Sequence, residues 1–358
     1  MTNIQDAFLR LLRLGIGTSE DIPTLDGVNW FNLERLANEQ GLLGVMLDGV
    51  EKLPQELRPE KKAILQSVGQ LLKSEQRYLA QEHAAVKMAL LLHQHGIRTY
   101  VLKGAVVSEC YPRPEHRRSV DLDCFLVAES GRNENVCERG NQVIEGQGIK
   151  VGRSFYKNSS FFFQGLHVEN HRYLTPFRGN KLLTRLESYL QKLLLEDDGP
   201  NRIAGTWLCR PPVMVSALFL IEHAYSHFLH EGLTIRHILD WVMFRERHAG
   251  DIDWKVFDGC IDEYGFRLFF DAYSHVGEFV AGDRDERELT VAELRMIESI
   301  WDGLDLHDTV EGFCGKLNLV GNTIRAAWKY RLFSPISMPH ALWIQVKGFL
   351  FLRNPRLG

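Results

Sequence analysis

Apolar positions in the first part of the chain recur at the spacing of amphipathic helices. Residues 71–94 fit one long helix, and earlier helices are separated by breaks at 15–23 and 54–59, where glycine, proline and capping residues gather. We therefore predict a helical N-terminal unit over residues 1–95.

The pattern changes after Gly96. Residues 97–102 are mostly β-branched, aromatic or aliphatic, and Gly104 follows them, which predicts a short buried strand and a tight turn. A helix is expected at 105–110. Residues 120–127 again have the composition of a strand, with apolar residues continuing past two acids. This stretch predicts a strand, a turn, a short helix and a second strand.

Later residues complete a mixed segment before helical spacing returns. We expect a helix at 132–147 and strands at 150–156 and 161–173. The fold class is therefore α+β. We assign its core to residues 96–180 and a second helical unit to residues 181–358.

Composition agrees with a folded protein of several packed units. The chain has 358 residues, of which 45% are hydrophobic and 25% are charged. A formal net charge of -4 gives no strong nucleic-acid signal. No stretch is long enough for a transmembrane segment, and the first residues lack the pattern of a signal peptide. The six cysteines show no metal-binding spacing, so we expect a reduced, cytoplasmic protein.

Asp121 and Asp123 form the strongest candidate for a chemical site. In a strand, residues two apart point to the same face with Cα atoms roughly 6.6 Å apart, so both carboxylates can share one site. Paired metal ions in phosphoryl-transfer enzymes lie about 3.5–4 Å apart, which such a pair can bracket. The alternative is a solvated strand end, because Asp-x-Asp is short and common. Lys103 and the turn at Gly104 favour the site, since they add a cation and a helix start.

These motifs together resemble a known family. The chain is similar to the uncharacterised nucleotidyltransferases of the DNA-polymerase-beta-like superfamily over about residues 97–175. The matching elements, in order, are Leu102-Lys103-Gly104, Tyr111-Pro112, Arg117, Asp121-Leu122-Asp123, Glu169 and His171.

The resemblance implies a small mixed β-sheet with helices behind it and a two-metal reaction. A nucleoside monophosphate would pass from an NTP, with ATP as the expected nucleotide, to the hydroxyl of an unidentified acceptor, using Mg²⁺ (or Mn²⁺). Asp121, Asp123 and Glu169 would be the catalytic metal ligands. The implied nucleotide-binding residues are Lys103, Gly104, Arg117 and His171.

Two departures leave alternatives open. The usual Gly-Ser turn of the superfamily is Lys103-Gly104 here, and the third acid is Glu169 where aspartate is more usual. A catalytically inactive nucleotide-binding or protein-interaction module that keeps the fold is therefore one alternative. An enzyme that modifies a Ser, Thr or Tyr hydroxyl of a protein is another.

His223, His227 and His230 lie at i, i+4 and i+7, on one face of a predicted helix. This spacing allows a zinc hypothesis. We favour packing against the catalytic unit, because the HExxH arrangement is absent and no cysteine is placed to help.

Overall fold

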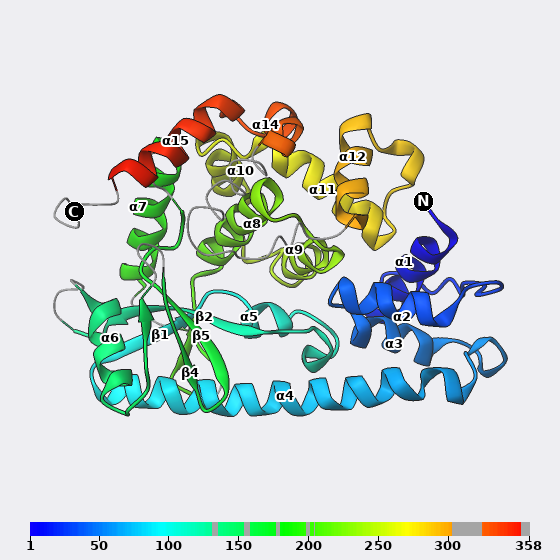
Figure 1. Ribbon diagram of the computed structural model, residues 1–358, viewed down its shortest axis with the longest axis horizontal. Coiled ribbons are helices and arrows are strands. Elements are labelled where there is room, and N and C mark those ends of the chain that lie inside the picture. Colours follow the sequence, from blue (N-terminus) through cyan, green and yellow to red (C-terminus); the bar gives the residue numbers. More distant parts are fainter. Residues whose placement is uncertain are drawn as a thin grey trace.

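A central sheet with helices on both faces organises the chain (Figure 1). The computed structural model describes residues 1–130, 135–153, 158–176, 180–197, 201–203, 205–302 and 324–351. The α+β class with helical flanks is confirmed. No helix in these ranges is long and apolar enough to cross a membrane. The division of the chain into three units stays a prediction.

The N-terminal helices cross at close range. They are α1 (Asn3–Ile16), α2 (Trp30–Glu39), α3 (Leu43–Lys52) and α4 (Lys61–Gln94), with a 3-10 turn, η1 (Gln55–Leu57), before α4. A Cβ atom on Gly15 would lie 2.1 Å from the carbonyl oxygen of Val45, and one on Gly49 would lie 2.0 Å from that of Leu11. Only glycine at these two positions allows α1 and α3 to approach so closely.

The 34-residue helix α4 joins these helices to the sheet. It begins at Lys61, ten residues before the predicted start at 71, and extends along one whole side of the molecule (Figure 1). Its first part packs against α2 and α3, and its last part packs against the sheet. The small side chains of Ala85 and Ala89 allow this close packing, with Met88 and Leu92 beside them.

The sheet is mixed and has the order β3-β4-β5-β2-β1-β7-β6. Its strands are β1 (Ile97–Val101), β2 (Asp121–Ala128), β3 (Gly152–Arg153), β4 (Asn158–Phe163), β5 (Leu166–His171), β6 (Asn201–Arg202) and β7 (Leu208–Arg210). Strand β2 pairs antiparallel with β1 and parallel with β5. The predicted strands at 97–102 and 120–127 are confirmed, and they lie side by side at the centre.

Two predictions about the later strands were wrong. The single strand predicted at 161–173 is a hairpin, in which Gln164 (φ 49°) and Gly165 (φ 84°) form a two-residue turn between β4 and β5. Strands β6 and β7 come from a stretch predicted to be helical, beyond the 96–180 range assigned to the core. They extend the sheet on the far side of β1. Helix α6 (Val136–Glu145) agrees with the prediction at 132–147 within the described residues.

The two faces of the sheet belong to different cores. Cys124 and Leu126 face α4 and α6, whereas Phe125 and Val127 face the C-terminal helices. Because side chains alternate along a strand, the odd-numbered positions of β2 continue this second face. Asp121 and Asp123 therefore point to the side of the C-terminal helices.

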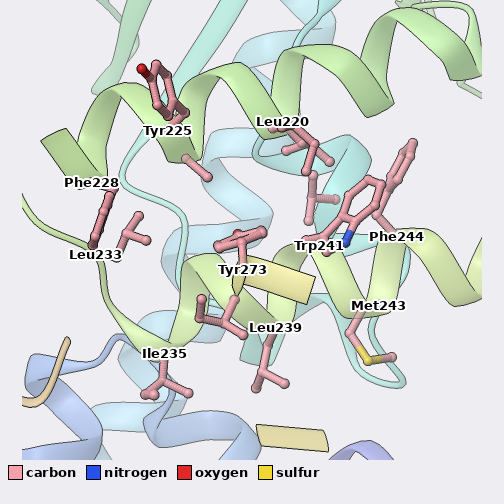
Figure 2. Close-up of a cluster of buried hydrophobic side chains, with 14 of the residues drawn as sticks. Leu220, Tyr225, Phe228, Leu233, Ile235, Leu239, Trp241, Met243, Phe244 and Tyr273 are labelled. Carbon is pink, nitrogen blue, oxygen red and sulfur yellow. The ribbon is translucent and has the colours of Figure 1, made fainter. Parts of the chain in front are cut away.

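The C-terminal helices pack around α8 and α9. They are α7 (Lys181–Leu195), α8 (Val213–His230), α9 (Ile235–Arg247), α10 (Trp254–Glu263), α11 (Arg267–Ala281), α12 (Val291–Trp301), α14 (Ala327–Phe333) and α15 (Met338–Phe351), with η3 (Glu286–Glu288) before α12. Figure 2 shows large side chains from both central helices, including Phe228 of α8 and Trp241 of α9, packed together with Tyr273 of α11. The Tyr273 hydroxyl donates to the carbonyl oxygen of His237 at 2.5 Å and so fixes the first turn of α9.

Arg13 and Thr18 tie the first helix and the residues after it to the end of α11. Arg13 of α1 donates to the carbonyl oxygens of Phe279 and Val280 at the end of α11, at 2.6 and 3.1 Å. The Thr18 hydroxyl donates to the next carbonyl, of Ala281, at 2.7 Å. These donors bond to carbonyl groups of the last turn of α11, where a helix runs short of backbone donors.

A buried histidine connects the loop before β2 to α3 and α4. His116, in η2 (Pro114–His116), places Nδ1 2.8 Å from Asp48 Oδ1 and Nε2 2.9 Å from Glu75 Oε1. Burial disfavours its charged form, but the hydrogen bonds to the two carboxylates outweigh burial and raise the pKa of His116.

Candidate functional site

Asp121 and Asp123 meet residues of β5 across the parallel pairing. Asp121 lies opposite His167, and Asp123 lies opposite Glu169. Paired residues in neighbouring strands point to the same face, so all four side chains, and that of His171 two residues on, converge. Figure 1 shows β2 and β5 adjacent below α8.

This convergence creates two overlapping groups of possible metal ligands. One contains Asp121, His167 and Glu169, and the other contains Asp123, Glu169 and His171. Within each group the ligand atoms lie within 4.8 Å of one another. The three predicted carboxylates are therefore brought together, with Glu169 in both groups. Sequence reasoning missed His167, although the alternation His-x-Glu-x-His places it on the same strand face.

Asp123 is the most buried acid of the cluster, with 2% of its surface exposed. Nε2 of His171 lies 2.8 Å from its Oδ1, and Nζ of Lys103 lies 3.2 Å from its Oδ2. Burial alone would raise the pKa of Asp123, but the charge of Lys103 and the hydrogen bond from His171 outweigh it and lower the pKa. Asp123 is thus held as a carboxylate.

The negative charge of Asp121 is compensated less well than that of Asp123. Burial, and next the negative charge of Asp123, raise the pKa of Asp121, and the more distant charge of Lys103 does not reverse the effect. In contrast, His171, whose Nε2 lies 3.7 Å from Glu169 Oε2, lowers the pKa of Glu169 against the effect of burial. Asn158 donates to Glu169 Oε2 at 2.7 Å and fixes its orientation.

The donor set fits a divalent cation. Carboxylate oxygens are the preferred ligands of Mg²⁺, and a bound cation would stabilise the ionised form of Asp121. The imidazoles of His167 and His171 add nitrogen ligands, so the site also suits Mn²⁺, which accepts nitrogen as well as oxygen ligands. Asp121, Asp123 and Glu169 would hold the ion, because they supply its charge compensation.

Lys103 and Gly104 occupy the turn after β1. The amide of Leu102 donates to the carbonyl oxygen of Asp123 at 3.0 Å, so strand pairing continues to the residue before Lys103. Gly104 has a φ of 70°, which favours glycine, and α5 (Ala105–Ser108) follows it. The ammonium group of Lys103 lies between Asp123 and His223, whose Nε2 is 3.2 Å away. Its contact with phosphate stays a prediction.

Arg117 is held in a buried ion pair with Asp240. Its Nε and Nη2 donate to Asp240 Oδ1 and Oδ2 at 2.9 and 2.6 Å, and only 3% of its surface is exposed. Tyr111 also donates to Asp240 Oδ1, at 2.9 Å. A phosphate clamp needs N–H groups that face the ligand, so this geometry favours a structural role over the predicted nucleotide contact.

The histidine face of α8 divides between two environments. The rings of His223 and His227 lie 4.3 Å apart, and both approach His237 of α9, at 6.4 and 5.3 Å. His230 instead lies beside Tyr330 of α14, at 6.4 Å. Within the described ranges, the groups able to hold a metal are those of β2 and β5. The favoured interpretation, packing against the catalytic unit, agrees with the contact between His223 and Lys103.

Comparison with known proteins gives one match. No curated protein and no solved structure matches the chain. The sequence model of a family described as "Uncharacterised nucleotidyltransferase" matches residues 26–277, which is more than half of the chain. The matched range includes the whole carboxylate cluster, together with α8 and α9. The chain therefore belongs to the uncharacterised nucleotidyltransferase family.

Proposed function

We propose that this protein is a divalent-metal-dependent nucleotidyltransferase that moves a nucleoside monophosphate from an NTP to an acceptor hydroxyl, with release of pyrophosphate. One observation carries the proposal. Asp121, Asp123 and Glu169 converge on one sheet face, in a chain whose family is described by this class of reaction. Opposite them, α8 and α9 provide a wall of histidine and arginine side chains.

In this proposal Asp121 and Asp123 hold the cation. The cation, when bound, would neutralise the charge of the phosphates and of the leaving pyrophosphate. His171 and Lys103 keep Asp123 ionised and oriented. The raised pKa of Asp121 means that this carboxylate gains most from the arrival of a cation.

Glu169 is suited to receive the proton of the acceptor hydroxyl. It belongs to both ligand groups, and Asn158 and His171 fix its position. Its carboxylate is ionised at neutral pH, as a proton acceptor must be. ATP is the proposed nucleotide. The acceptor is a small molecule, a sugar or a protein hydroxyl.

A nucleotide-binding module without transfer activity is the second candidate. It is favoured by the contacts of Asp123, where His171 and Lys103 lie against both carboxylate oxygens. A lysine that stays on Asp123 would compete with a cation for the same oxygen. The two candidates differ in whether nucleotide is transferred.

The test is incubation of the purified protein with cell extract, Mg²⁺ or Mn²⁺, and each of the four NTPs. We expect an acceptor to be labelled from α-³²P-NTP and not from γ-³²P-NTP, because nucleotidyl transfer retains only the α-phosphate. The Asp121→Asn variant should lose labelling, whereas Asp26→Asn, at an exposed position outside the site, should keep it. Equal labelling by wild type and Asp121→Asn would refute the metal-site assignment. Binding of NTP without labelling would favour the second candidate.

A further inference from the structure

Two guanidinium groups share one buried carboxylate at the start of α9. Asp240 already accepts from Arg117 through both oxygens and from Tyr111 through Oδ1. Nη1 of Arg236 approaches Asp240 Oδ2 only to 3.7 Å, which is beyond hydrogen-bond distance. The group of two arginines and one aspartate therefore carries a surplus positive charge.

Arg236 is the less enclosed of the two arginines. Its side chain is 24% exposed, whereas that of Arg117 is 3% exposed. Gly41 packs against it so closely that a Cβ atom there would lie 3.2 Å from Nε and 3.3 Å from Cδ. Arg236 is thus held in place on one side and reachable on another, as a binding residue should be.

The position of Arg236 connects it to the carboxylate cluster. Burial and the charge of Arg117 lower the pKa of Arg236, while the charges of Asp240 and Asp121 act in the opposite direction. Asp121 is therefore one of the charges that act on Arg236, as it is on Arg117.

A series of histidines continues from Arg236 to Lys103. His237 follows Arg236 in α9, and its Nδ1 accepts from the amide of Thr234 at 3.1 Å, which leaves the ring hydrogen on Nε2. Its ring lies 6.4 Å from that of His223, and His223 contacts Lys103. One wall of the site therefore presents hydrogen-bond donors and positive charge opposite the acids.

We propose that Arg236 binds the phosphate chain of the nucleotide, with His237 beside it. This inference rests on the proposed function, and it assigns the phosphate contact to α9 in place of Arg117. A partly exposed arginine with surplus charge suits an anion, because its N–H groups can donate in pairs to phosphate oxygens. A phosphate chain extending from the carboxylate cluster toward α9 would bring its negative charge to Arg236.

The experiment is isothermal titration of the full-length protein with inorganic tripolyphosphate, without divalent metal. The Arg236→Gln variant should bind about tenfold or more weakly, as expected for losing charge-assisted hydrogen bonds, and Arg236→Lys should bind with intermediate affinity. Arg247→Gln is the matched control, because this exposed arginine lies at the other end of α9 and should bind as wild type does. A melting curve for each variant verifies the fold.

Two further titrations separate this inference from the proposed function. The affinity of Arg236→Gln for Mn²⁺ alone and for adenosine should equal that of wild type, because neither ligand carries phosphate. Equal tripolyphosphate affinity for Arg236→Gln and wild type, or no binding by wild type, would overturn the inference even if nucleotide transfer is observed. Arg236-dependent binding with no transfer from any NTP would support the phosphate site and refute the proposed enzyme.

Discussion

Lys103 should compete with the metal for Asp123, so removing its charge should strengthen metal binding. The two charged atoms lie 3.2 Å apart, and Asp123 is almost fully buried. At that distance and an effective dielectric constant of about 20, the attraction is about 5 kcal/mol. Lys103 is itself 20% exposed, and His171 still contacts Asp123, so we expect a smaller net loss. Lys103→Met should reduce the metal-free unfolding free energy by about 2–4 kcal/mol.

The same change should increase the affinity for Mn²⁺ in the absence of nucleotide by about tenfold to hundredfold, which corresponds to about 1.4–2.8 kcal/mol of the lost stabilisation. The assays are urea unfolding in EDTA and in Mn²⁺, and calorimetric titration with Mn²⁺. Lys73→Met, at an exposed position of α4, is the control for loss of a lysine charge. Weaker Mn²⁺ binding by Lys103→Met would mean that Lys103 assists the metal, and the reasoning would be wrong.

Three other changes test separate parts of the structure. Glu169→Gln should leave binding of a non-hydrolysable NTP nearly unchanged and lower turnover by about 10²–10⁴, the range for a lost general base; unchanged turnover would exclude that role. Because the folded-state pKa of His116 is raised above 6.5, its stabilisation is present below that pH and is lost as pH rises through the higher pKa. His116→Gln should therefore flatten the pH dependence of urea unfolding on the alkaline side, and an unaltered profile would contradict this. Arg117→Met should destabilise the fold by about 3–5 kcal/mol, because buried Asp240 would lose its bidentate partner and keep only the Tyr111 hydroxyl and the more distant Arg236. Arg117→Met with Asp240→Leu should recover part of the loss in the same assay.

The centre of the fold could be predicted because its hydrophobic patterns are long. The strand with Asp121 and Asp123 and its neighbour β1 follow from runs of apolar and β-branched residues. The common face of the two acids follows from the two-residue period of a strand. That Glu169 belongs with them came from the family resemblance, and the parallel pairing of β2 with β5 now supplies the physical reason.

The hairpin was missed because three consecutive phenylalanines hide the alternation of β4. Phe161 and Phe163 are buried, but Phe162 is 66% exposed, which hydrophobicity alone does not indicate. Strands β6 and β7 have two and three residues, too few for a detectable period.

The environment of Arg117 could not be predicted for a different reason. Its partner Asp240 lies 123 positions later, and only the tertiary fold brings that carboxylate to it. The order of motifs along the chain placed Arg117 near the site but could not show which way its side chain points. The resemblance to the family extends more loosely to the helix with Arg236 and Asp240, but it did not indicate that Asp240 pairs with Arg117.

The contacts of α1 with the end of α11 make the molecule a closed frame. From the sheet, α4 leads to the N-terminal helices, which contact the end of α11 through Arg13 and Thr18. Helix α11 packs against α9, and α9 contacts the loop before β2 through the pair of Asp240 with Arg117. The sheet and α9, which form the two walls of the site, are therefore connected through α4 and the N-terminal helices as well as through the Arg117–Asp240 pair. In the proposed reaction, a bulky acceptor would therefore have to reach the carboxylates without a hinge opening between the sheet and α9, which the closed frame resists.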